Sequence, residues 1–356
     1  MHNSTGRAID GSSSILLDSI RIASAVIVLI NHAVLEWLTG YPDLNKEMDQ
    51  LAHAAVVVFF VLSGYLIAFT TTKNNRGPKQ YAIARLSRLY SVVLPALLLT
   101  AIIEIVVHNT NPSLASQYAR GSSWPRYALS ALFCNEAGVF SASPPINGPL
   151  WSLSFEFWYY TIFGLWFYRK PNWKSLLLLA GGCFIAGPKI ILLMPIWLFG
   201  LLAYRLPRPI FTKNIAWLFT SAYLFIALII AVYAPAFPFE LGQKPLFYAN
   251  RFITDWIIGV FIALSIWSLP QDEHAVKAPD VKLLRTVADL SFPLYILHYP
   301  LFILWKSLFG WRTNDVGQMC QVTFFVSLIA LIIGAWMENQ RNVWVRFFRW
   351  LIPTGR

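Results

Sequence analysis

Ionisable residues interrupt several apolar runs of this sequence, and their types and spacing suggest acid–base chemistry. In LDSIRIASAVIVLINH, residues 17–32, Arg21 and His32 lie eleven residues apart. On an α-helix this spacing is about 20° past three full turns and about 16 Å along the axis, so the two side chains share one face. Asp18, three residues before Arg21, can pair with it on that face. Charged residues in a membrane span are functional candidates by default. The structural alternatives are that Arg21 extends its guanidinium to the membrane interface and that His32 is a packing residue.

A carboxylate interrupts the aromatic segment GPLWSLSFEFWYY, residues 148–160. By helical rise, Glu156 lies about 10 Å inside its predicted span, at a depth similar to that of His32. A carboxylate beside an imidazole can set its tautomer and raise its basicity. We therefore predict that Glu156 meets His32 or the substrate on which His32 acts; hydrogen bonding to Trp or Tyr partners is the structural alternative.

Three further stretches place polar residues in or beside apolar runs. RLSR puts Arg85 and Arg88 on one helix face at the start of a span, where two guanidinium groups suit phosphate binding or anchor the span at the cytoplasmic side. SFPLYILHYPL places His298 near mid-membrane between two prolines, as a functional or a packing histidine. In FFVLSGYLIAF, Ser63 and Gly64 favour close helix packing over a nucleophilic role.

The composition indicates what must position these residues. Hydrophobic residues make up 57% of the 356 and charged residues 13%, whereas a soluble domain carries about a quarter charged residues. Most apolar segments reach the roughly 20 residues that a helix needs to cross the hydrocarbon core. We therefore predict an all-α, polytopic integral membrane protein with about ten transmembrane helices, at roughly 15–38, 52–72, 81–107, 148–168, 174–187, 189–204, 214–234, 251–269, 286–309 and 319–338. The fifth and sixth segments are short and broken by glycines, so they make either two spans or one re-entrant hairpin.

The distribution of basic residues predicts the orientation. With a cytoplasmic N-terminus, nineteen Lys and Arg residues fall in the inside gaps and tails and eight in the outside gaps, which agrees with the positive-inside rule. Both termini are therefore expected in the cytoplasm. The expected organisation is a cytoplasmic tail at 1–14, a transmembrane domain at 15–338 with an outside loop at about 108–147, and a basic cytoplasmic tail at 339–356.

Other functional classes fit less well. The net charge of +11 does not indicate nucleic acid, because no basic run stands outside the short gaps between apolar segments. Cys134, Cys183 and Cys320 are odd in number and show no CxxC spacing, so neither a disulfide framework nor a metal site is expected. The first apolar run ends without a small-residue cleavage site, which favours an uncleaved span over a signal peptide.

Together these stretches resemble the membrane-bound acyltransferase 3 family, bacterial enzymes that acylate sugars and other hydroxyl acceptors. Five motifs match in family order: Arg–x10–His, FFxLSGFLI, Arg–x–x–Arg, WSLxxE and YLxH. Their residues in this chain are Arg21, His32, Ser63, Gly64, Arg85, Arg88, Trp151, Ser152, Glu156, Tyr295 and His298. Tyr65 stands for the usual Phe and Ser19 for a usual Gly. The resemblance covers about residues 16–338 and corresponds to the stand-alone form without a fused C-terminal domain.

The resemblance implies an acyl-CoA donor, most often acetyl-CoA, used as a co-substrate from the cytoplasm, and no permanently bound cofactor. It implies a carbohydrate or other hydroxyl acceptor, such as O-antigen, exopolysaccharide or a lipid-linked glycan, and a place in the bacterial cytoplasmic (inner) membrane. Because Glu156 and His32 both lie toward the outer side of their predicted spans, we expect the acceptor to approach from that side. Arg21, Arg85 and Arg88 would hold the donor phosphates.

In this scheme His32 is the general base, Glu156 assists it, and His298 binds the thioester oxygen or the acceptor. Transfer through an acyl-histidine is the competing scheme. The rival from another class is a proton-coupled transporter or flippase that uses the same residues. Inverted repeats would favour that rival, and none is apparent in the sequence. A structural membrane subunit is the third class, which the shared faces and depths of the ionisable residues disfavour.

Overall fold

The computed structural model describes residues 11–73, 75, 77–270 and 279–352. Within these ranges every regular element is a helix. Most of the predicted N-terminal tail (residues 1–10) and the last four residues of the predicted C-terminal tail (353–356) lie outside the described residues. The structure therefore addresses the predicted transmembrane domain and most of the segment that follows it.

Seven of the described helices are long and apolar enough to cross a membrane, which confirms the prediction of an all-α polytopic membrane protein. They are α1 (Gly11–Trp37), α2 (Pro42–Lys73), α3 (Pro78–Thr110), α7 (Trp173–Arg205), α8 (Lys213–Tyr233), α10 (Pro279–Phe309) and α11 (Val316–Asn339). The shorter elements are α4 (Pro112–Tyr118), α5 (Ser123–Ala131), η1 (Gly148–Leu150), α6 (Trp151–Phe167), η2 (Phe247–Ala249), α9 (Phe252–Trp267) and α12 (Arg341–Leu351). The ten predicted segments correspond to nine of these helices, because two of them fall in α7.

The two short segments that fall in α7 meet at a break in the helix. The backbone at Gly187 is non-helical, with φ 82° and ψ 178°, a conformation that favours glycine. A Cβ at Gly187 would lie 2.4 Å from the Cα of Gly138, and the Gly138 N–H donates to the carbonyl of Ala186 at 2.9 Å. Gly187 therefore permits both the break and the close approach of the loop that precedes η1.

Local sequence signals set several helix starts. Pro78 and Pro112 stand in the first turns of α3 and α4, where the missing N–H of proline has no helical partner to lose. The Asn111 side chain accepts a hydrogen bond from the Leu114 N–H at 3.1 Å, and the Asp315 side chain caps the start of α11 in the same way. These caps satisfy amide groups that a helix N-terminus leaves free.

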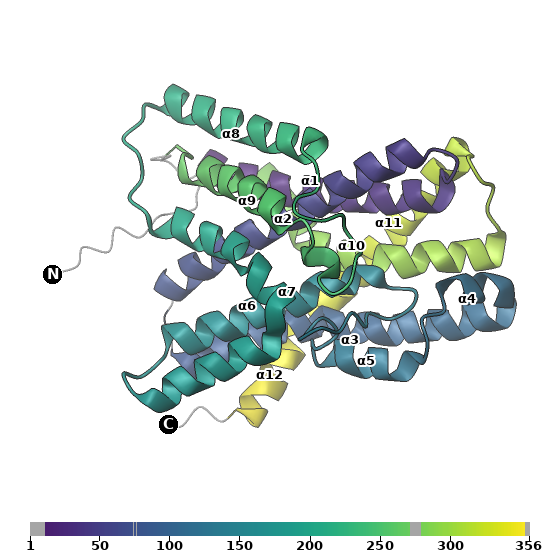
Figure 1. Cartoon of the computed structure of the whole chain (residues 1–356), viewed down its shortest axis with the longest axis horizontal. Coiled ribbons are helices and arrows are strands. Elements are labelled where there is room, and N and C mark those ends of the chain that lie inside the picture. Colours follow the sequence, from purple (N-terminus) through teal and green to yellow (C-terminus); the bar gives the residue numbers. More distant parts are fainter. Residues whose placement is uncertain (1–10, 74, 76, 271–278, 353–356) are drawn as a thin grey trace. The chain divides into compact units, whose positions relative to one another are not determined.

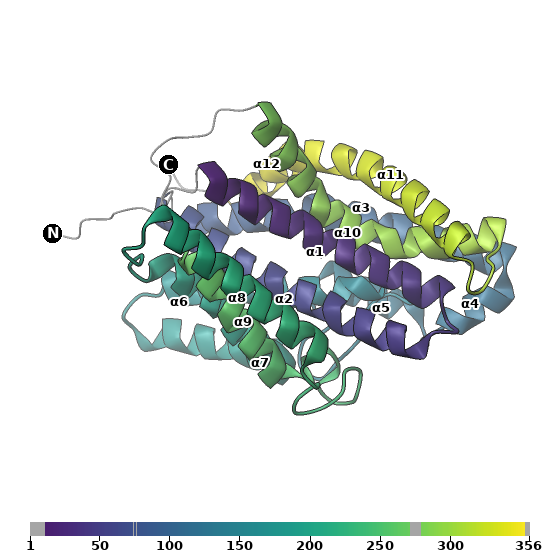
Figure 2. The ribbon, with the colours of Figure 1, turned by 90° about the horizontal axis from the view of Figure 1, so that it is seen from above.

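The chain divides into two compact units, each assembled from separate segments. The first unit comprises Met1–Ser24, Gln50–Asn75 and Ile191–Asp289. In it, α8 and α9 run side by side (Figures 1 and 2). The α2 helix meets the second part of α7 so closely that a Cβ at Gly64 or Gly200 would lie 1.9 Å from a backbone carbonyl oxygen of the facing helix. Small residues therefore set this helix contact, as is common in membrane helices.

The second unit comprises Ala25–Asp49, Arg76–Ile190 and Leu290–Arg356. Here α4, α5, α6, α11 and α12 pack on α3, and Figure 1 shows α4 and α5 beside it. Part of the predicted basic tail forms α12, whose Trp344 and Phe348 rings lie 5.9 and 5.5 Å from the ring of Tyr90. Aromatic residues four apart share one helix face, which explains why this segment folds onto α3.

Candidate active site

Two histidines from opposite ends of the sequence meet in the second unit. His32 on α1 and His298 on α10 have ring centroids 5.1 Å apart, with the ring planes tilted by 34°. In the described part of the chain, neither the buried Nδ1 of His32 nor the buried Nε2 of His298 has a hydrogen-bond partner. Buried polar atoms are normally paired. Unpaired nitrogens in two adjacent rings therefore leave the pair able to form a further hydrogen bond, either between the rings or to a bound reactant.

The hydrogen bonding of His298 identifies its tautomer. Its Nδ1 lies 3.0 Å from the backbone carbonyl oxygen of Leu294. A carbonyl oxygen only accepts, so Nδ1 carries the proton of the neutral ring and Nε2 carries the lone pair. The unpaired nitrogen beside His32 is therefore a hydrogen-bond acceptor.

A proline in α10 connects this helix to the start of the α6 segment. Pro300 has no N–H, so the carbonyl of Ile296 has no helical partner at that position. The buried Asn147 side chain supplies one: its Nδ2 donates to the Ile296 carbonyl at 3.1 Å and to the Thr100 hydroxyl at 3.0 Å. Asn147 thus fixes the residues before η1 against the turn of α10 that carries His298.

Two of the predicted supporting residues lie beside His298. The hydroxyl groups of Ser152 and Tyr295 are 2.9 Å apart, and Tyr295 also donates to the carbonyl of Pro149 at 3.1 Å. The Tyr295 ring centroid is 6.3 Å from that of His298. Trp151, in contrast, packs edge-on against another aromatic ring of α6. The structure therefore places Ser152 and Tyr295 beside the histidine pair, whereas the ring contact of Trp151 lies within α6.

A carboxylate without a predicted role lies one helical turn beyond His32. Glu36 accepts hydrogen bonds from Tyr118 at 2.6 Å and Tyr299 at 2.9 Å, and pairs with Lys306 at 2.5 Å. The Tyr299 ring lies 4.9 Å from that of His32. Burial, reinforced by Glu36, raises the pKa of Tyr118 above its ordinary value, so this phenol stays protonated and donates. The cluster fixes Tyr299 against His32 while Lys306 balances the charge of Glu36.

The expected contact between Glu156 and His32 is not seen among the described residues. Glu156 instead accepts a hydrogen bond from Tyr160, one turn further along α6. Tyr160 in turn lies within electrostatic range of Arg85 and Arg88. Equal depth in the membrane does not fix the direction in which two side chains point, which is why the depth argument did not predict this arrangement. A role for Glu156 in the reaction stays a prediction.

Arg85 lines a cavity of about 440 Å³ bounded by α3, α6 and the first part of α7. Its guanidinium lies over the rings of Tyr81 and Tyr160, at 5.7 and 5.9 Å from their centroids, and the Tyr81 hydroxyl donates to the Tyr160 carbonyl at 3.0 Å. Arg169 also lines the cavity, and Arg88 follows Arg85 by three residues on α3. Guanidinium groups and aromatic rings suit a ligand that carries phosphates and a heteroaromatic base.

Asp18 and Arg21 attract each other electrostatically, as predicted, but the ion pairs of both residues are with α10. In the first unit, Nη1 of Arg21 lies 3.7 Å from Asp289, and Nε of Arg285 lies 4.0 Å from Asp18. A facing helix with both signs of charge thus adds a partner for each residue to the attraction between neighbours on one helix. A contact of Arg21 with an acyl donor stays a prediction.

Ser63 and Gly64 lie where α2 packs against α7 in the first unit. The Trp197 indole donates to the Ser63 hydroxyl at 3.2 Å. Gly64 faces the backbone of Trp197, where a Cβ would collide with the carbonyl oxygen. Both residues therefore support helix packing, the role that their sequence context favoured.

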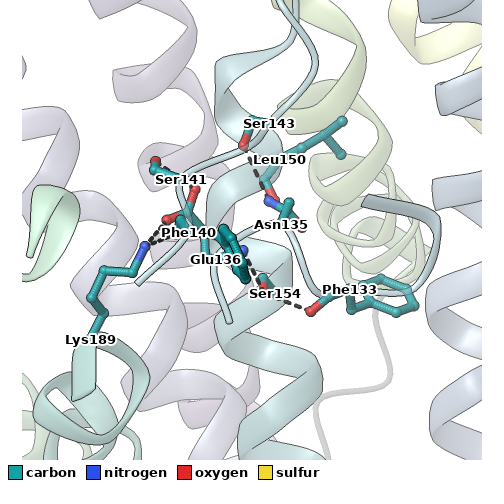
Figure 3. A network of polar contacts seen from close by, with 9 residues as sticks. All are labelled: Phe133, Asn135, Glu136, Phe140, Ser141, Ser143, Leu150, Ser154 and Lys189. Atoms are coloured by element: carbon teal, nitrogen blue, oxygen red, sulfur yellow. Dashed lines mark hydrogen bonds and ion pairs between the residues drawn. The ribbon is translucent and has the colours of Figure 1, made fainter. Parts of the chain in front are cut away.

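A second buried network fixes the loop between α5 and η1 (Figure 3). Lys189 on α7 donates to Glu136 at 2.5 Å and also to the carbonyl of Phe140, and both charged side chains are fully buried. The Glu136 N–H donates to Ser154 on α6 at 3.3 Å. Burial raises the pKa of the Glu136 carboxyl to about 7, against the opposing effect of the Lys189 ammonium. Lys189 is thus a buried partner of this loop, although the count of basic residues assigned it to the outside gaps.

A groove of about 540 Å³ lies between α3, α4 and α5 in the second unit. The exposed Trp124 and the side chains of Glu104 and His108 line it. Glu104 accepts hydrogen bonds from Ser123 at 2.5 Å and Tyr127 at 2.6 Å. Burial and the Glu104 carboxylate raise the pKa of Tyr127, so its phenol remains a donor. A flat aromatic ring beside polar groups suits a ligand with both apolar faces and hydroxyl groups.

Among the residues that the structure describes, no group of His, Cys, Asp and Glu is arranged to hold a metal ion. Cys134, Cys183 and Cys320 are free thiols.

Glu36, Tyr299 and Asn147 were not predicted to have a role, and only some of them could have been identified from the sequence. Glu36 follows His32 by four residues, a spacing that places both on one helix face, and Tyr299 directly follows His298. Either spacing is a usable signal. Asn147 carries no such signal, because its partner carbonyl is made available by Pro300, far away in the chain.

Comparison with known proteins places these observations in context. The sequence pattern of a family described as an acyltransferase domain matches residues 15–337. The chain is 23% identical over 299 residues to an O-acetyl transferase of Shigella phage Sf6, which covers 80% of this chain and 83% of that protein. It is 24% identical over 377 residues to the peptidoglycan O-acetyltransferase OatA of Listeria monocytogenes, covering 94% of this chain but 57% of that longer protein. No solved structure matches the chain significantly.

Proposed function

The chain belongs to the acyltransferase 3 family, and from that premise we propose that it transfers an acetyl group from acetyl-CoA to a hydroxyl group of a carbohydrate. The observation that carries this proposal is the histidine pair, with one unpaired nitrogen in each of two adjacent rings. An acyl transfer to a hydroxyl needs a base for the hydroxyl proton, and a neutral imidazole is the most common one.

In the proposed reaction His32 is the base and His298 supports it. The acceptor hydroxyl gives its proton to Nε2 of His32 while its oxygen attacks the thioester carbonyl carbon. The carbon–sulfur bond then breaks, and the CoA thiolate takes the proton from His32. The products are an acetyl ester and CoA, with no net change in protons.

His298 stabilises the positive ring that forms in between. With its lone pair on Nε2, it accepts a hydrogen bond from Nδ1–H of the protonated His32, while its own Nδ1–H stays bonded to Leu294. This is the part that a carboxylate plays beside the histidine of a serine hydrolase. The hydrogen bond of Asn147 to the Ile296 carbonyl supports the position of His298.

The cavity at Arg85 is the proposed binding site for the donor. Its guanidinium and tyrosine rings suit the phosphates and adenine of acetyl-CoA, and Arg88 and Glu156 extend the same polar region through Tyr160. We assign Arg21 to the donor on the resemblance alone. The membrane in question is then the bacterial cytoplasmic membrane, with the donor on its inner side.

The carbohydrate acceptor is proposed to enter through the groove that Trp124 and Glu104 line. This proposal is supported by two segments that line the groove, because each continues into residues beside the histidine pair. Ala115 and Ala119 belong to the same segment as Tyr118, which bonds to Glu36 one turn from His32, and Ile146 directly precedes Asn147. A relative that acts on peptidoglycan by name agrees with a polymer acceptor outside the cytoplasm.

The test is binding and turnover of acetyl-CoA by the purified protein. Arg85→Ala with Arg88→Ala is expected to weaken acetyl-CoA binding at least tenfold, because two charge-assisted contacts to phosphate are lost. Arg312→Ala, at an exposed arginine paired with Asp315, is the matched control and is expected to bind like the wild type. Binding without any release of CoA, with or without saccharide acceptors, would favour the transporter class over the enzyme.

A further inference from the structure

A fully buried arginine in the first unit has most of its hydrogen-bonding capacity unused. Arg251 and Asp255 are both 0% exposed, and Nε of Arg251 donates to one oxygen of Asp255 at 3.1 Å. Within the part of the chain that the structure describes, Nη1 and Nη2 of Arg251 have no hydrogen-bond partner. A guanidinium group has five N–H donors, so four of them are unsatisfied.

Both oxygens of the carboxylate that pairs with Arg251 are hydrogen-bonded. The second oxygen of Asp255 accepts from Nε2 of His53, on α2, at 2.8 Å. One Asp255 oxygen therefore serves the arginine and the other serves the histidine. Asp255 cannot turn to cover Nη1 and Nη2 without giving up one of these bonds, so the free edge of the guanidinium needs a different acceptor.

The location adds a second, independent preference for negative charge. Arg251 stands immediately before α9, a helix of 16 residues. The N-terminus of a helix carries unsatisfied N–H groups and the positive end of the helix dipole, and it is a common binding place for oxyanions. The segment around it is well fixed, because Thr254 bonds to the backbone of Pro235 and Phe237.

We propose that Arg251 at the N-terminus of α9 forms a buried binding site for an oxyanion, a phosphate or carboxylate group. The two Nη atoms offer parallel N–H donors that match two oxygens of one such group. Asp255 orients the guanidinium and His53 orients Asp255, so the site is preorganised.

This inference is independent of the proposed acyl transfer. The site shares no residue with the histidine pair or with the cavity at Arg85, and it lies within the first unit. By the predicted topology, α9 begins at the outer side of the membrane. A phosphate group there comes either from a lipid or lipid-linked substrate or from free phosphate in solution.

The test uses the full chain purified in a neutral detergent. Thermal unfolding is followed against increasing inorganic phosphate, acetate or short-chain phosphatidic acid, at constant ionic strength, with short-chain phosphatidylcholine as the neutral lipid control. A ligand that binds the folded state raises the midpoint temperature in a saturable way. We expect at least one of the three anions to do so in the wild type, and a stronger response to phosphatidic acid than to inorganic phosphate identifies a lipid source.

Two variants tie the response to the site. Arg251→Lys keeps the charge beside Asp255 but removes the paired Nη donors. It is expected to weaken anion binding at least tenfold. Should Arg251→Lys fail to fold, the neutral double variant Arg251→Gln with Asp255→Asn replaces it. Arg312→Lys, at an exposed arginine outside both proposed sites, is the matched control and is expected to keep the response. The proposal is overturned if no anion stabilises the wild type, or if the Arg251 variants respond as the wild type does.

Discussion

Replacing His298 by alanine removes the acceptor proposed to stabilise protonated His32. A hydrogen bond to a charged group is worth about 1.5–3 kcal/mol, and each 1.36 kcal/mol of barrier is tenfold in rate, so kcat is expected to fall by about 10- to 150-fold. His32→Ala removes the base itself and is expected to lower kcat by about 10²- to 10⁴-fold. The KM for acetyl-CoA is expected to stay within a few-fold in both variants, because neither ring lines the cavity at Arg85.

The double variant distinguishes a supporting role from an independent one. His298 acts through His32 in the proposed reaction, so adding His298→Ala to His32→Ala is expected to cost almost nothing further. Two independent contributions would multiply instead, to about 10³- to 10⁶-fold. His298→Gln, whose amide oxygen can accept a hydrogen bond, is expected to recover part of the loss that His298→Ala causes.

The assay is release of the CoA thiol from acetyl-CoA by protein in detergent, with water or a saccharide as acceptor. Thermal unfolding of each variant checks that it is folded, since His298 is buried. A multiplicative double variant, or a His298→Ala enzyme with wild-type kcat, would refute the idea that His298 supports His32.

Three further changes follow from the packing. Asn147→Ala is expected to destabilise the protein by about 1–3 kcal/mol, because it leaves the buried carbonyl of Ile296 unsatisfied. Pro300→Ala in that background returns the helical N–H and is expected to restore part of the loss. A double variant no more stable than Asn147→Ala in thermal unfolding would contradict this explanation. Gly64→Ala is expected to cost about 1–3 kcal/mol or more of unfolding free energy through overpacking. Gly181→Ala, where a Cβ meets nothing within 4 Å, is expected to be neutral. Equal midpoint temperatures of thermal unfolding for the two variants would argue against the close contact between α2 and α7. Lys189→Met leaves a buried carboxylate without its cation and is expected to cost about 3–5 kcal/mol, which chemical or thermal unfolding in detergent would measure; a loss below about 1 kcal/mol would show that the pair is not buried.

The helices themselves are predictable from the sequence because the bilayer imposes one rule on every span. The predicted segment 81–107 corresponds to Pro78–Thr110, and 214–234 corresponds to Lys213–Tyr233. A backbone that leaves water must satisfy its polar groups internally, so a long apolar run has few alternatives to a helix. The helix α12 was missed because it lies after the last apolar run, in a segment where charge obscures the aromatic spacing.

The candidate residues can be named one by one from the sequence, but their arrangement cannot. His32 and His298 were each singled out, yet their meeting depends on how α1 and α10 rotate about their own axes, which hydropathy does not determine. The same limitation explains why Glu156 bonds to Tyr160 and not to His32. Asp18 and Arg21 show the limit of pairing rules within one helix, since a facing helix supplied further partners for both.

The most direct test of the central claim is the transfer of labelled acetyl groups to carbohydrate. Proteoliposomes that contain the protein would be given acetyl-labelled CoA on the donor side, with extracted cell-envelope saccharides as acceptors. The proposed reaction predicts label in the carbohydrate fraction that mild alkali releases as acetate, and its loss by at least 10²-fold in His32→Ala. Alkali-labile label that forms equally well in His32→Ala, or wild-type protein that binds acetyl-CoA and labels no saccharide, would contradict the proposal that the histidine pair catalyses acetyl transfer.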